Sequence, residues 1–325
     1  MSKTHPMAQH TSCFGISSKL QELICLVAQS YVFEDGEELL DQILGIQISA
    51  KQLQRVSEHY GQQIEQQQQQ YVEAQLPAPA LELKSPEDPV YGLVDGSMIY
   101  TREEGWKEIK VGRFFAGSDC VAIQQQRNQI TRSMYVCHLG DHEKFIEKWE
   151  AYTEQYKNKI FIADGAKWLW KWVEDNCPDS VQILDYFHAV EKLAQYASCQ
   201  YGDQGERKQW MELQKQQLLN DKVTEVIGQL QNTTAKSIEA EKARTDTIRY
   251  YQNNVKRMLY KTYLDHGYLI GSGAIESAHR NVVQQRLKLS GQRWSVEGAQ
   301  QIVNLRAYKK SNRWNEVVQS IKNAA

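Results

Sequence analysis

The sequence predicts a mixed α/β protein that begins with a helical region. Three observations predict this class: apolar residues recur at helical spacing over residues 17–75, four prolines follow within residues 76–89, and strand-like and helix-like segments then alternate. The 325 residues have room for two or three domains. Contents of 41% hydrophobic and 24% charged residues are typical of a globular protein.

The N-terminal region is expected to contain three short helices after a flexible tail of residues 1–16. The first helical pattern begins at Ser17, and the second helix covers residues 36–44 and ends at Gly45. Ser49 can cap the third helix because its hydroxyl can accept a hydrogen bond from an amide of the first turn.

The third helix allows two interpretations. In a helix-turn-helix it would lie in a DNA major groove, and Lys51, Gln54 and Arg55 on its polar face would contact DNA. In a bundle that serves packing or dimerisation, the same polar face would be a solvated surface. The sequence fits both interpretations.

A change of composition marks the clearest domain boundary. Residues 62–75 are rich in glutamine and either extend the third helix or form a polar spacer. Residues 76–89 contain four prolines, which predict an extended linker.

After the linker, residues 90–202 are expected to form the first part of a sheet core. Segments rich in apolar, β-branched and aromatic residues predict strands over residues 90–99, 106–115, 133–139, 160–163 and 181–184. Helical spacing predicts helices over residues 141–156, 166–175 and 186–201. Three strands in series, followed by alternating strands and helices, indicate a mixed sheet with helices on its faces.

The rest of the sequence is expected to be helical. Residues 203–268 are polar, rich in Gln, Lys and Glu, and have few apolar anchors, which predicts a helical insertion. Residues 269–325 return to the core with a helix over residues 274–289. Ser295 can cap a last helix that runs to about residue 309.

Charge and cysteine usage narrow the class of protein. The formal net charge is −2, yet from Glu241 onward 15 Lys and Arg stand against 6 Asp and Glu. A basic C-terminal quarter is the expected footprint of a polyanion partner, and an acidic neighbour within the fold is the alternative.

The six cysteines form no CxxC pair, so we expect reduced thiols in a cytosol. No apolar run reaches about 18 residues, so we expect no membrane span.

Two aspartates follow apolar strand candidates in the same pattern. Asp95 and Asp164 each end such a strand and are each followed by glycine. Functional residues gather at the carboxyl ends of strands in open α/β sheets, and Glu276 follows a Gly-rich turn at the start of a helix. Three such carboxylates could hold two Mg²⁺ ions that act on a phosphodiester. An ordinary Asp-Gly turn is the alternative for each aspartate alone.

Five segments resemble bacterial insertion-sequence DDE transposases of the ISKra type, which are related to the Mutator-like group. These segments are residues 94–96 (VDG), 162–170 (IADGAKWLW), 184–189 (LDYFHA), 271–277 (GSGAIES) and 290–299 (SGQRWSVEGA). The resemblance spans about residues 17–308 and implies an RNase H-like sheet core with an all-helical insertion. It also implies that Asp95, Asp164 and Glu276 are the catalytic, metal-binding triad, with two Mg²⁺ (or Mn²⁺) ions as cofactor.

The resemblance adds two supporting residues. Asp185 and His188 match a C/D-x-x-H signature in which the histidine orients the site or contacts DNA. A helix N-cap formed by Asp185, with His188 packed behind it, is the alternative.

Further DNA contacts are expected in the C-terminal region. The residues concerned are Arg280, Arg286, Lys288, Arg293 and Trp294. Helical spacing places Glu276, His279 and Arg280 on one face, where Arg280 could hold a phosphate or pair with Glu276. Arg293 and Trp294 could stack on a DNA base, or Trp294 could be buried.

The expected function is therefore that of a DNA transposase. It would hydrolyse phosphodiesters at transposon ends and transfer the freed 3′-hydroxyl into target DNA. The expected partners are double-stranded DNA and further copies of the chain in a homo-oligomer, in a bacterial cytoplasm close to the nucleoid. The alternatives are a catalytically inactive or domesticated transposase-derived DNA-binding protein and a stand-alone RNase H-like nuclease.

Overall fold

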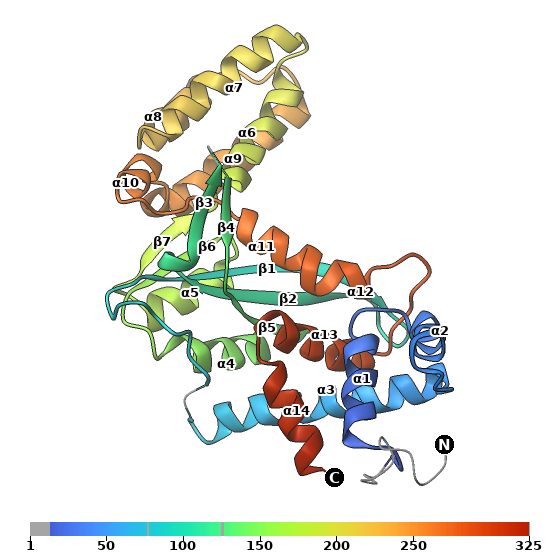
Figure 1. Cartoon of the computed structure of the whole chain (residues 1–325). Coiled ribbons are helices and arrows are strands. Elements are labelled where there is room, and N and C mark those ends of the chain that lie inside the picture. Colours follow the sequence, from blue (N-terminus) through green and yellow to red (C-terminus); the bar gives the residue numbers. More distant parts are fainter. Residues whose placement is uncertain (1–13, 77, 125–126, 325) are drawn as a thin grey trace. The chain divides into compact units, whose positions relative to one another are not determined.

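The computed structural model describes residues 14–76, 78–124 and 127–324 (Figure 1). The chain divides into two compact units, of which the first comprises Met1–Lys157 and Ile275–Ala325 and the second Asn158–Ala274. Strands in the first unit are antiparallel and strands in the second are parallel, with helices in both, so the mixed α/β class is confirmed. The division after Lys157 falls inside the segment 90–202 that the sequence predicts as one part of a core. Residues 1–13 of the predicted tail lie outside the described residues.

Three N-terminal helices open the first unit, as predicted. They are α1 (Ser18–Ala28), α2 (Phe33–Leu44) and α3 (Ala50–Glu73). The side chains of Ser17 and Ser49 cap α1 and α3 by accepting hydrogen bonds from the amides of Leu20 and Gln52. Gly45, with φ 60°, ends α2 in the left-handed conformation that glycine adopts readily. Helix α2 begins three residues before its predicted start.

Helix α3 continues through the glutamine-rich segment and packs along α13 (Val296–Lys310). The two helices approach closely at Gly61, where an added Cβ would lie 2.2 Å from the carbonyl oxygen of Gln301. The Nδ2 of Asn304 donates to the carbonyl oxygen of Gly61 at 3.2 Å. One side of α3 is therefore packed against α13. A further helix, α14 (Trp314–Asn323), was not predicted from the sequence and packs against α1 and α3.

Three antiparallel strands form the sheet of the first unit, at the predicted positions. Strand β1 (Val90–Thr101) pairs with β2 (Gly105–Ala116), which pairs with β5 (Met134–Leu139). Helix α4 (His142–Thr153) packs against β2 and β5. The ring of Trp149 occupies the space beside Gly112 and stacks on Phe114 with 4.0 Å between ring centroids.

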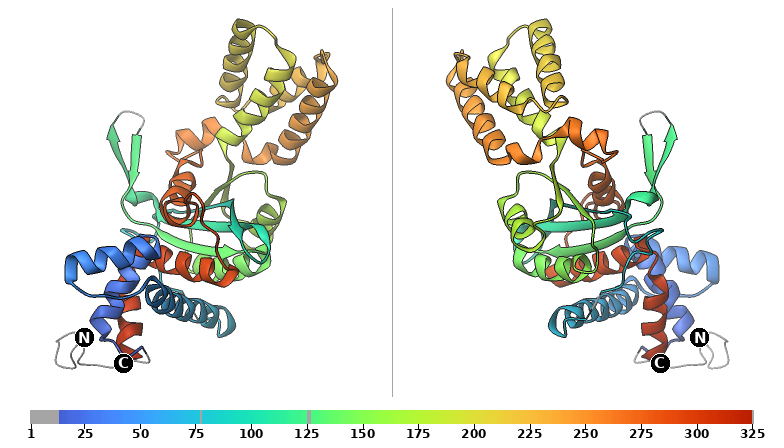
Figure 2. Two further views of the ribbon diagram at one scale, coloured as in Figure 1. Left: turned by 90° about the vertical axis from the view of Figure 1, so that its right-hand side faces the viewer. Right: turned by 90° about the vertical axis from the view of Figure 1, so that its left-hand side faces the viewer.

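A second pair of strands in the first unit was not expected from the sequence. Strands β3 (Cys120–Gln124) and β4 (Arg127–Ile130) form an antiparallel hairpin that projects from the rest of this unit (Figure 2). The side chains of Val121 and Ile123 are exposed. None of the described side chains of the hairpin is buried, and its sequence lacks the alternation that identifies a strand.

The second unit contains two parallel strands and six helices in the described part of the chain. Strand β6 (Lys159–Ala163), α5 (Lys167–Asn176) and β7 (Val181–Leu184) form a β-α-β unit in which Ala163 lies opposite Leu184. The other helices are α6 (Tyr186–Gln200), α7 (Gln204–Leu218), α8 (Val223–Asn232), α9 (Ile238–Asn254) and α10 (Tyr260–Asp265). Helix α9 packs along α6, where the Tyr251 hydroxyl donates to the carbonyl oxygen of Ala189 at 2.8 Å.

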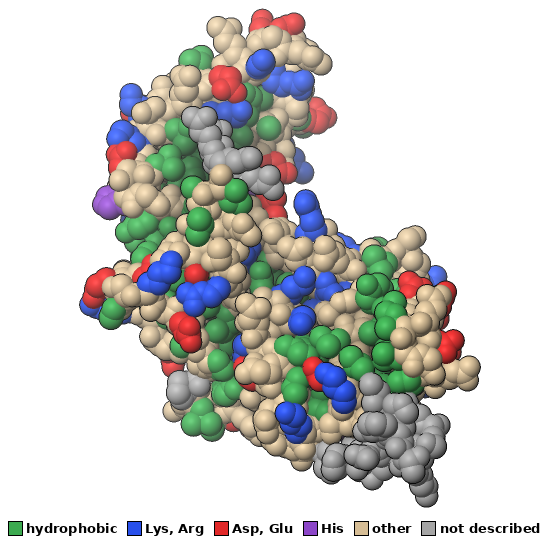
Figure 3. All heavy atoms as spheres, in the orientation of Figure 1, with side chains coloured by type: hydrophobic (Ala, Val, Ile, Leu, Met, Phe, Trp, Pro, Cys, Tyr) green, Lys and Arg blue, Asp and Glu red, His purple; other side chains and the backbone are tan. Residues whose placement is uncertain are grey.

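The helix predicted over residues 274–289 contains an irregularity. It consists of α11 (Gly273–Ala278), a π-helical turn (His279–Gln284) and α12 (Gln285–Leu287). Single π turns within helices occur frequently at functional sites. In Figure 3, Lys and Arg side chains gather on the face over α11 and α12.

No helix in the described part of the chain combines the length and the apolar character that a membrane crossing needs.

Candidate catalytic and DNA-binding residues

Asp95 does not end a strand, contrary to the sequence prediction. Strand β1 continues to Thr101, and Asp95 and Gly96 lie opposite Val111 and Lys110 in its ladder with β2. Pairing with β2 keeps the Asp-Gly dipeptide extended, which also excludes the alternative of an Asp-Gly turn. The Asp95 side chain is one-third exposed, so solvent and ligands can reach its carboxylate.

His279 joins Asp95 to the helix that carries Glu276. The Nε2 atom of His279 lies 3.5 Å from Oδ2 of Asp95, and His279 is 3% exposed. Burial lowers the pKa of His279, and the Asp95 carboxylate opposes that shift. The first unit therefore places the π-helical turn that begins at His279 beside β1 at Asp95. The sequence signal for this contact was the spacing of three residues between Glu276 and His279, which places both residues on one face of a helix.

The predicted common face of this helix divides into a buried and an exposed part. His279 and Val283 are buried, whereas Glu276 and Arg280 are exposed. Glu276 is thus accessible on the surface of the first unit, and so is Arg280, the residue expected to hold a phosphate.

Asp164 has the predicted position at the carboxyl end of a strand. Strand β6 ends at Ala163, and the Oδ1 atom of Asp164 accepts a hydrogen bond from the amide of Ala166 at 3.0 Å. Its carbonyl oxygen accepts a hydrogen bond from Nε1 of Trp170 at 2.6 Å. These two bonds fix the turn from β6 into α5, and the Asp164 side chain stays half-buried.

Gly165 is required beside Asp164 because a side chain from α9 fills the adjacent space. A Cβ on Gly165 would lie 2.3 Å from Cε2 of Tyr250. Burial raises the pKa of Tyr250, and the nearby carboxylates of Asp164 and Asp185 raise it further. The helical region of the second unit thus contacts the turn that carries Asp164.

Asp185 links three parts of the second unit. Its amide donates to the carbonyl oxygen of Ala163 at 2.8 Å, which joins β7 to the end of β6. Its Oδ1 atom accepts hydrogen bonds from the amides of Phe187 at 3.0 Å and Ser272 at 3.1 Å, and its Oδ2 atom contacts Nδ1 of His188.

The structure thus shows the N-cap that was one of the two interpretations of Asp185. Burial raises the pKa of Asp185, but the hydrogen bonds from His188 and Ser272 outweigh it and lower the pKa. The amide of Tyr186 also donates to the carbonyl oxygen of Ile270 at 2.9 Å. The segment before Glu276 is therefore held at the carboxyl ends of β6 and β7, which Asp164 and Asp185 directly follow.

Two of the predicted DNA-binding residues, Arg286 and Trp294, are buried. Arg286 is 1% exposed and lies between Phe33 and Trp294, 4.9 and 4.7 Å from their ring centroids. Its Nε atom donates to the carbonyl oxygen of Ala28 at 2.9 Å, and burial lowers its pKa to about 10. The Nε1 atom of Trp294 donates to the carbonyl oxygen of Leu287 at 3.1 Å. We correct both assignments: these side chains pack the C-terminal segment against the N-terminal helices.

The other predicted DNA-binding residues lie at the surface of the first unit. Lys51, Arg55, Arg280, Lys288 and Arg293 are exposed, and Gln54 is half-buried. Nε2 of Gln54 donates to Oε1 of Glu58 at 2.8 Å. The buried side of α3 packs against α13, as expected for a packing bundle, while Lys51 and Arg55 remain exposed on its other side. A DNA contact by this exposed side stays a prediction.

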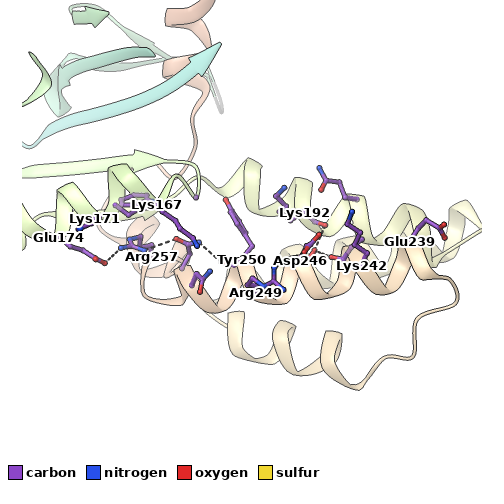
Figure 4. A pocket seen from close by; sticks show the side chains of 17 residues that line it. Lys167, Lys171, Glu174, Lys192, Glu239, Lys242, Asp246, Arg249, Tyr250 and Arg257 are labelled. Carbon is purple, nitrogen blue, oxygen red and sulfur yellow. Dashed lines mark hydrogen bonds and ion pairs between the residues drawn. The ribbon is translucent and has the colours of Figure 1, made fainter. Parts of the chain in front are cut away.

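A groove that the sequence analysis did not predict lies among α5, α6 and α9 of the second unit (Figure 4). It has a volume of about 780 Å³ and begins at Gly165, next to Asp164. Six basic side chains line it: Lys167, Lys171, Lys192, Lys242, Arg249 and Arg257. The acidic residues among its lining are Glu174, Glu239 and Asp246. We refer to it as the basic groove.

The three predicted metal ligands supply suitable donors for a divalent cation. Carboxylate oxygens are the ligands that Mg²⁺ prefers, and Asp95, Asp164 and Glu276 are all at least partly exposed. Asp95 and Glu276 belong to the first unit and Asp164 to the second. Among the residues that the structure describes, no three or more His, Cys, Asp or Glu side chains form a group that could hold a metal ion.

No protein-family model matches this chain, and neither does any curated protein.

Proposed function

We propose that the protein is a metal-dependent DNA transposase with an RNase H-like core. One observation supports this most: in the second unit the hydrogen bonds of Asp185 join Ala163 of segment 162–170, Phe187 of segment 184–189 and Ser272 of segment 271–277. Segment 271–277 lies more than 80 residues after segment 184–189, and each of the three segments carries a motif of the transposase resemblance. Their convergence is what a common active site would require.

In this proposal Asp95, Asp164 and Glu276 hold two Mg²⁺ or Mn²⁺ ions through their carboxylates. When bound, such ions activate an attacking water or 3′-hydroxyl and neutralise the charge that develops on the phosphate. His279 would orient the Asp95 carboxylate, which lies 3.5 Å away. Arg280 would hold a phosphate of the bound strand, since a guanidinium can pair with a phosphate through two hydrogen bonds.

The test compares Asp164→Asn with Asp175→Asn in Mg²⁺-dependent nicking of DNA taken from both sides of the chain's own gene. Asp164→Asn should abolish strand cleavage while DNA binding and the urea unfolding midpoint stay near those of the wild type. The amide keeps an oxygen that can accept the Ala166 hydrogen bond.

Asp175 is the matched control because it is exposed on α5 and loses the same charge. Its variant should cleave normally. Full cleavage by Asp164→Asn would end the proposal. DNA binding by a wild-type protein that never cleaves would favour an inactive, transposase-derived DNA-binding protein instead.

A further inference from the structure

We infer that the basic groove binds a short segment of a single DNA strand through its phosphates. Binding by the groove can be measured without cleavage. Only the role of that strand, as the one that continues from the cleaved bond, rests on the proposed function.

The charge of the groove favours a polyanion. Six basic side chains stand against three acidic ones along its lining. Two of the basic side chains are already paired: Arg257 with Glu174, and Arg249 with Asp246 at 3.8 Å. Pairing therefore leaves an excess of positive charge from the lysines.

Four lysines carry this excess, and none of them forms an ion pair within the described residues. They are Lys167, Lys171, Lys192 and Lys242. Lys167 and Lys171 lie one turn apart on α5, Lys192 is on α6 and Lys242 is on α9. Cations from three helices thus line one hollow (Figure 4). Phosphates are the natural ligand for such an arrangement, because each neutralised phosphate releases condensed counterions.

The other side chains of the groove suit a strand with exposed bases. The Tyr250 ring lines the groove next to Gly165, and the Nζ atom of Lys192 lies 5.8 Å from its centroid. Aromatic rings and flanking cations together form the usual platform for single-stranded nucleic acid. The volume of about 780 Å³ lies in the range of pockets for compact ligands, about 300–1,000 Å³. A space of this volume can take a few nucleotides of one strand.

The position of the groove connects it to the proposed chemistry. Gly165 lines the groove and directly follows Asp164 in the sequence. Tyr250 contacts Gly165 and also lines the groove. A strand whose phosphodiester lies at Asp164 would therefore meet the cations of α5, α6 and α9 within its next nucleotides.

The test measures binding of a fluorescent eight-nucleotide single strand to the full chain over a series of salt concentrations. The double variant Lys171→Gln/Lys242→Gln removes two groove cations. Binding should weaken, and the slope of log K against log[salt] should fall by about 1.4, or about 0.7 for each lost phosphate contact. Lys171→Arg/Lys242→Arg should restore binding because it restores the charge.

The matched control is Lys208→Gln/Lys222→Gln, which removes the same charge from exposed positions of the second unit outside the groove. It should leave the affinity and the salt slope unchanged. The inference would be overturned if the affinity falls equally in both Lys→Gln double variants or falls in neither. It would also be overturned if the matching duplex binds and depends on the groove lysines to the same extent. Displacement of the strand by tripolyphosphate at equal phosphate concentration would also overturn it, since it would show a site for small anions.

Asp164→Asn separates this inference from the proposed function. This variant should bind the single strand like the wild type while it fails to cleave. Groove-dependent binding by a protein that never cleaves would support the groove and refute the transposase. If the wild type cleaves DNA but the groove variants bind the single strand normally, the transposase proposal is supported and the groove inference is refuted.

Discussion

Gly165→Ala tests the contact between the turn at Asp164 and helix α9. The new Cβ would lie 2.3 Å from Cε2, 3.1 Å from Cδ2 and 3.3 Å from Cζ of Tyr250. Ordinary contact begins near 3.4 Å, so the ring or the turn has to move by about 1 Å at the closest atom. Tyr250 lies on a helix that packs along α6, which limits the movement of its ring. We expect a loss of about 2 kcal/mol in the free energy of unfolding, within the range of 1–3 kcal/mol for overpacking.

A double-mutant cycle isolates the contact from other effects of the substitution. Tyr250→Ala removes the ring, so Gly165→Ala in that background should cost at most about 0.5 kcal/mol. It could even stabilise the protein, because alanine restricts the unfolded chain more than glycine does. The expected coupling energy between the two positions is therefore about 1.5–2 kcal/mol.

Equilibrium urea unfolding, followed by far-UV circular dichroism, measures all four proteins of the cycle. Gly228→Ala on α8 is the control, because a Cβ there meets no atom within 4 Å and alanine favours a helix by up to about 1 kcal/mol. If Gly165→Ala costs the same with and without the tyrosine ring, the steric reasoning is wrong. If the proposed function holds, Gly165→Ala should also cleave DNA more slowly, since a displaced turn misplaces Asp164.

Three further predictions concern the first unit. Gly61→Ala should destabilise it by about 2–3 kcal/mol in urea unfolding, because the added Cβ meets the backbone oxygen of Gln301 at 2.2 Å. Arg286→Met should lower the unfolding midpoint, because Ala28 loses a buried hydrogen bond, whereas Lys288→Met should change it little. Burial lowers the pKa of His138 to about 4 from 6.5. Since the unfolded chain takes up this proton near pH 6.5 and the folded chain only near pH 4, stability should fall by about 2 kcal/mol from pH 8 to pH 5. His138→Gln should lose that part of the pH dependence; an unchanged pH profile would contradict the assignment.

Local sequence patterns predicted most of the regular elements. The five strands of the two larger sheet segments follow apolar runs, and Ser49 and Ser295 cap helices as predicted. Helix α14 has Arg313 rather than a capping Ser, Thr, Asp or Asn at its start, so it lacked the usual signal. The β3–β4 hairpin also lacked a sequence signal, because none of its described side chains is buried.

The candidate site was predicted only where local sequence decides the structure. A short apolar run followed by Asp-Gly placed Asp164 correctly after β6. The same dipeptide misled at Asp95, because pairing with β2 overrides its tendency to turn. Arginine is rarely fully buried, and the burial of Arg286 depends on Phe33, more than 250 residues away in the sequence. The basic groove likewise gathers residues from three helices that no single motif connects.

The helix that carries Glu276 shows how such distant contacts orient a candidate catalytic residue. Its buried stripe includes Ile275, His279, Val282 and Arg286. Two of these residues are polar, and burial of a polar group is costly unless a partner compensates for it. The Nε2 atom of His279 lies 3.5 Å from Oδ2 of Asp95, and Arg286 donates to the carbonyl oxygen of Ala28 and lies between two aromatic rings. These partners fix both the rotation of the helix and its position along β1. The outward direction of the Glu276 side chain therefore follows from two buried residues that a search for acidic motifs does not consider.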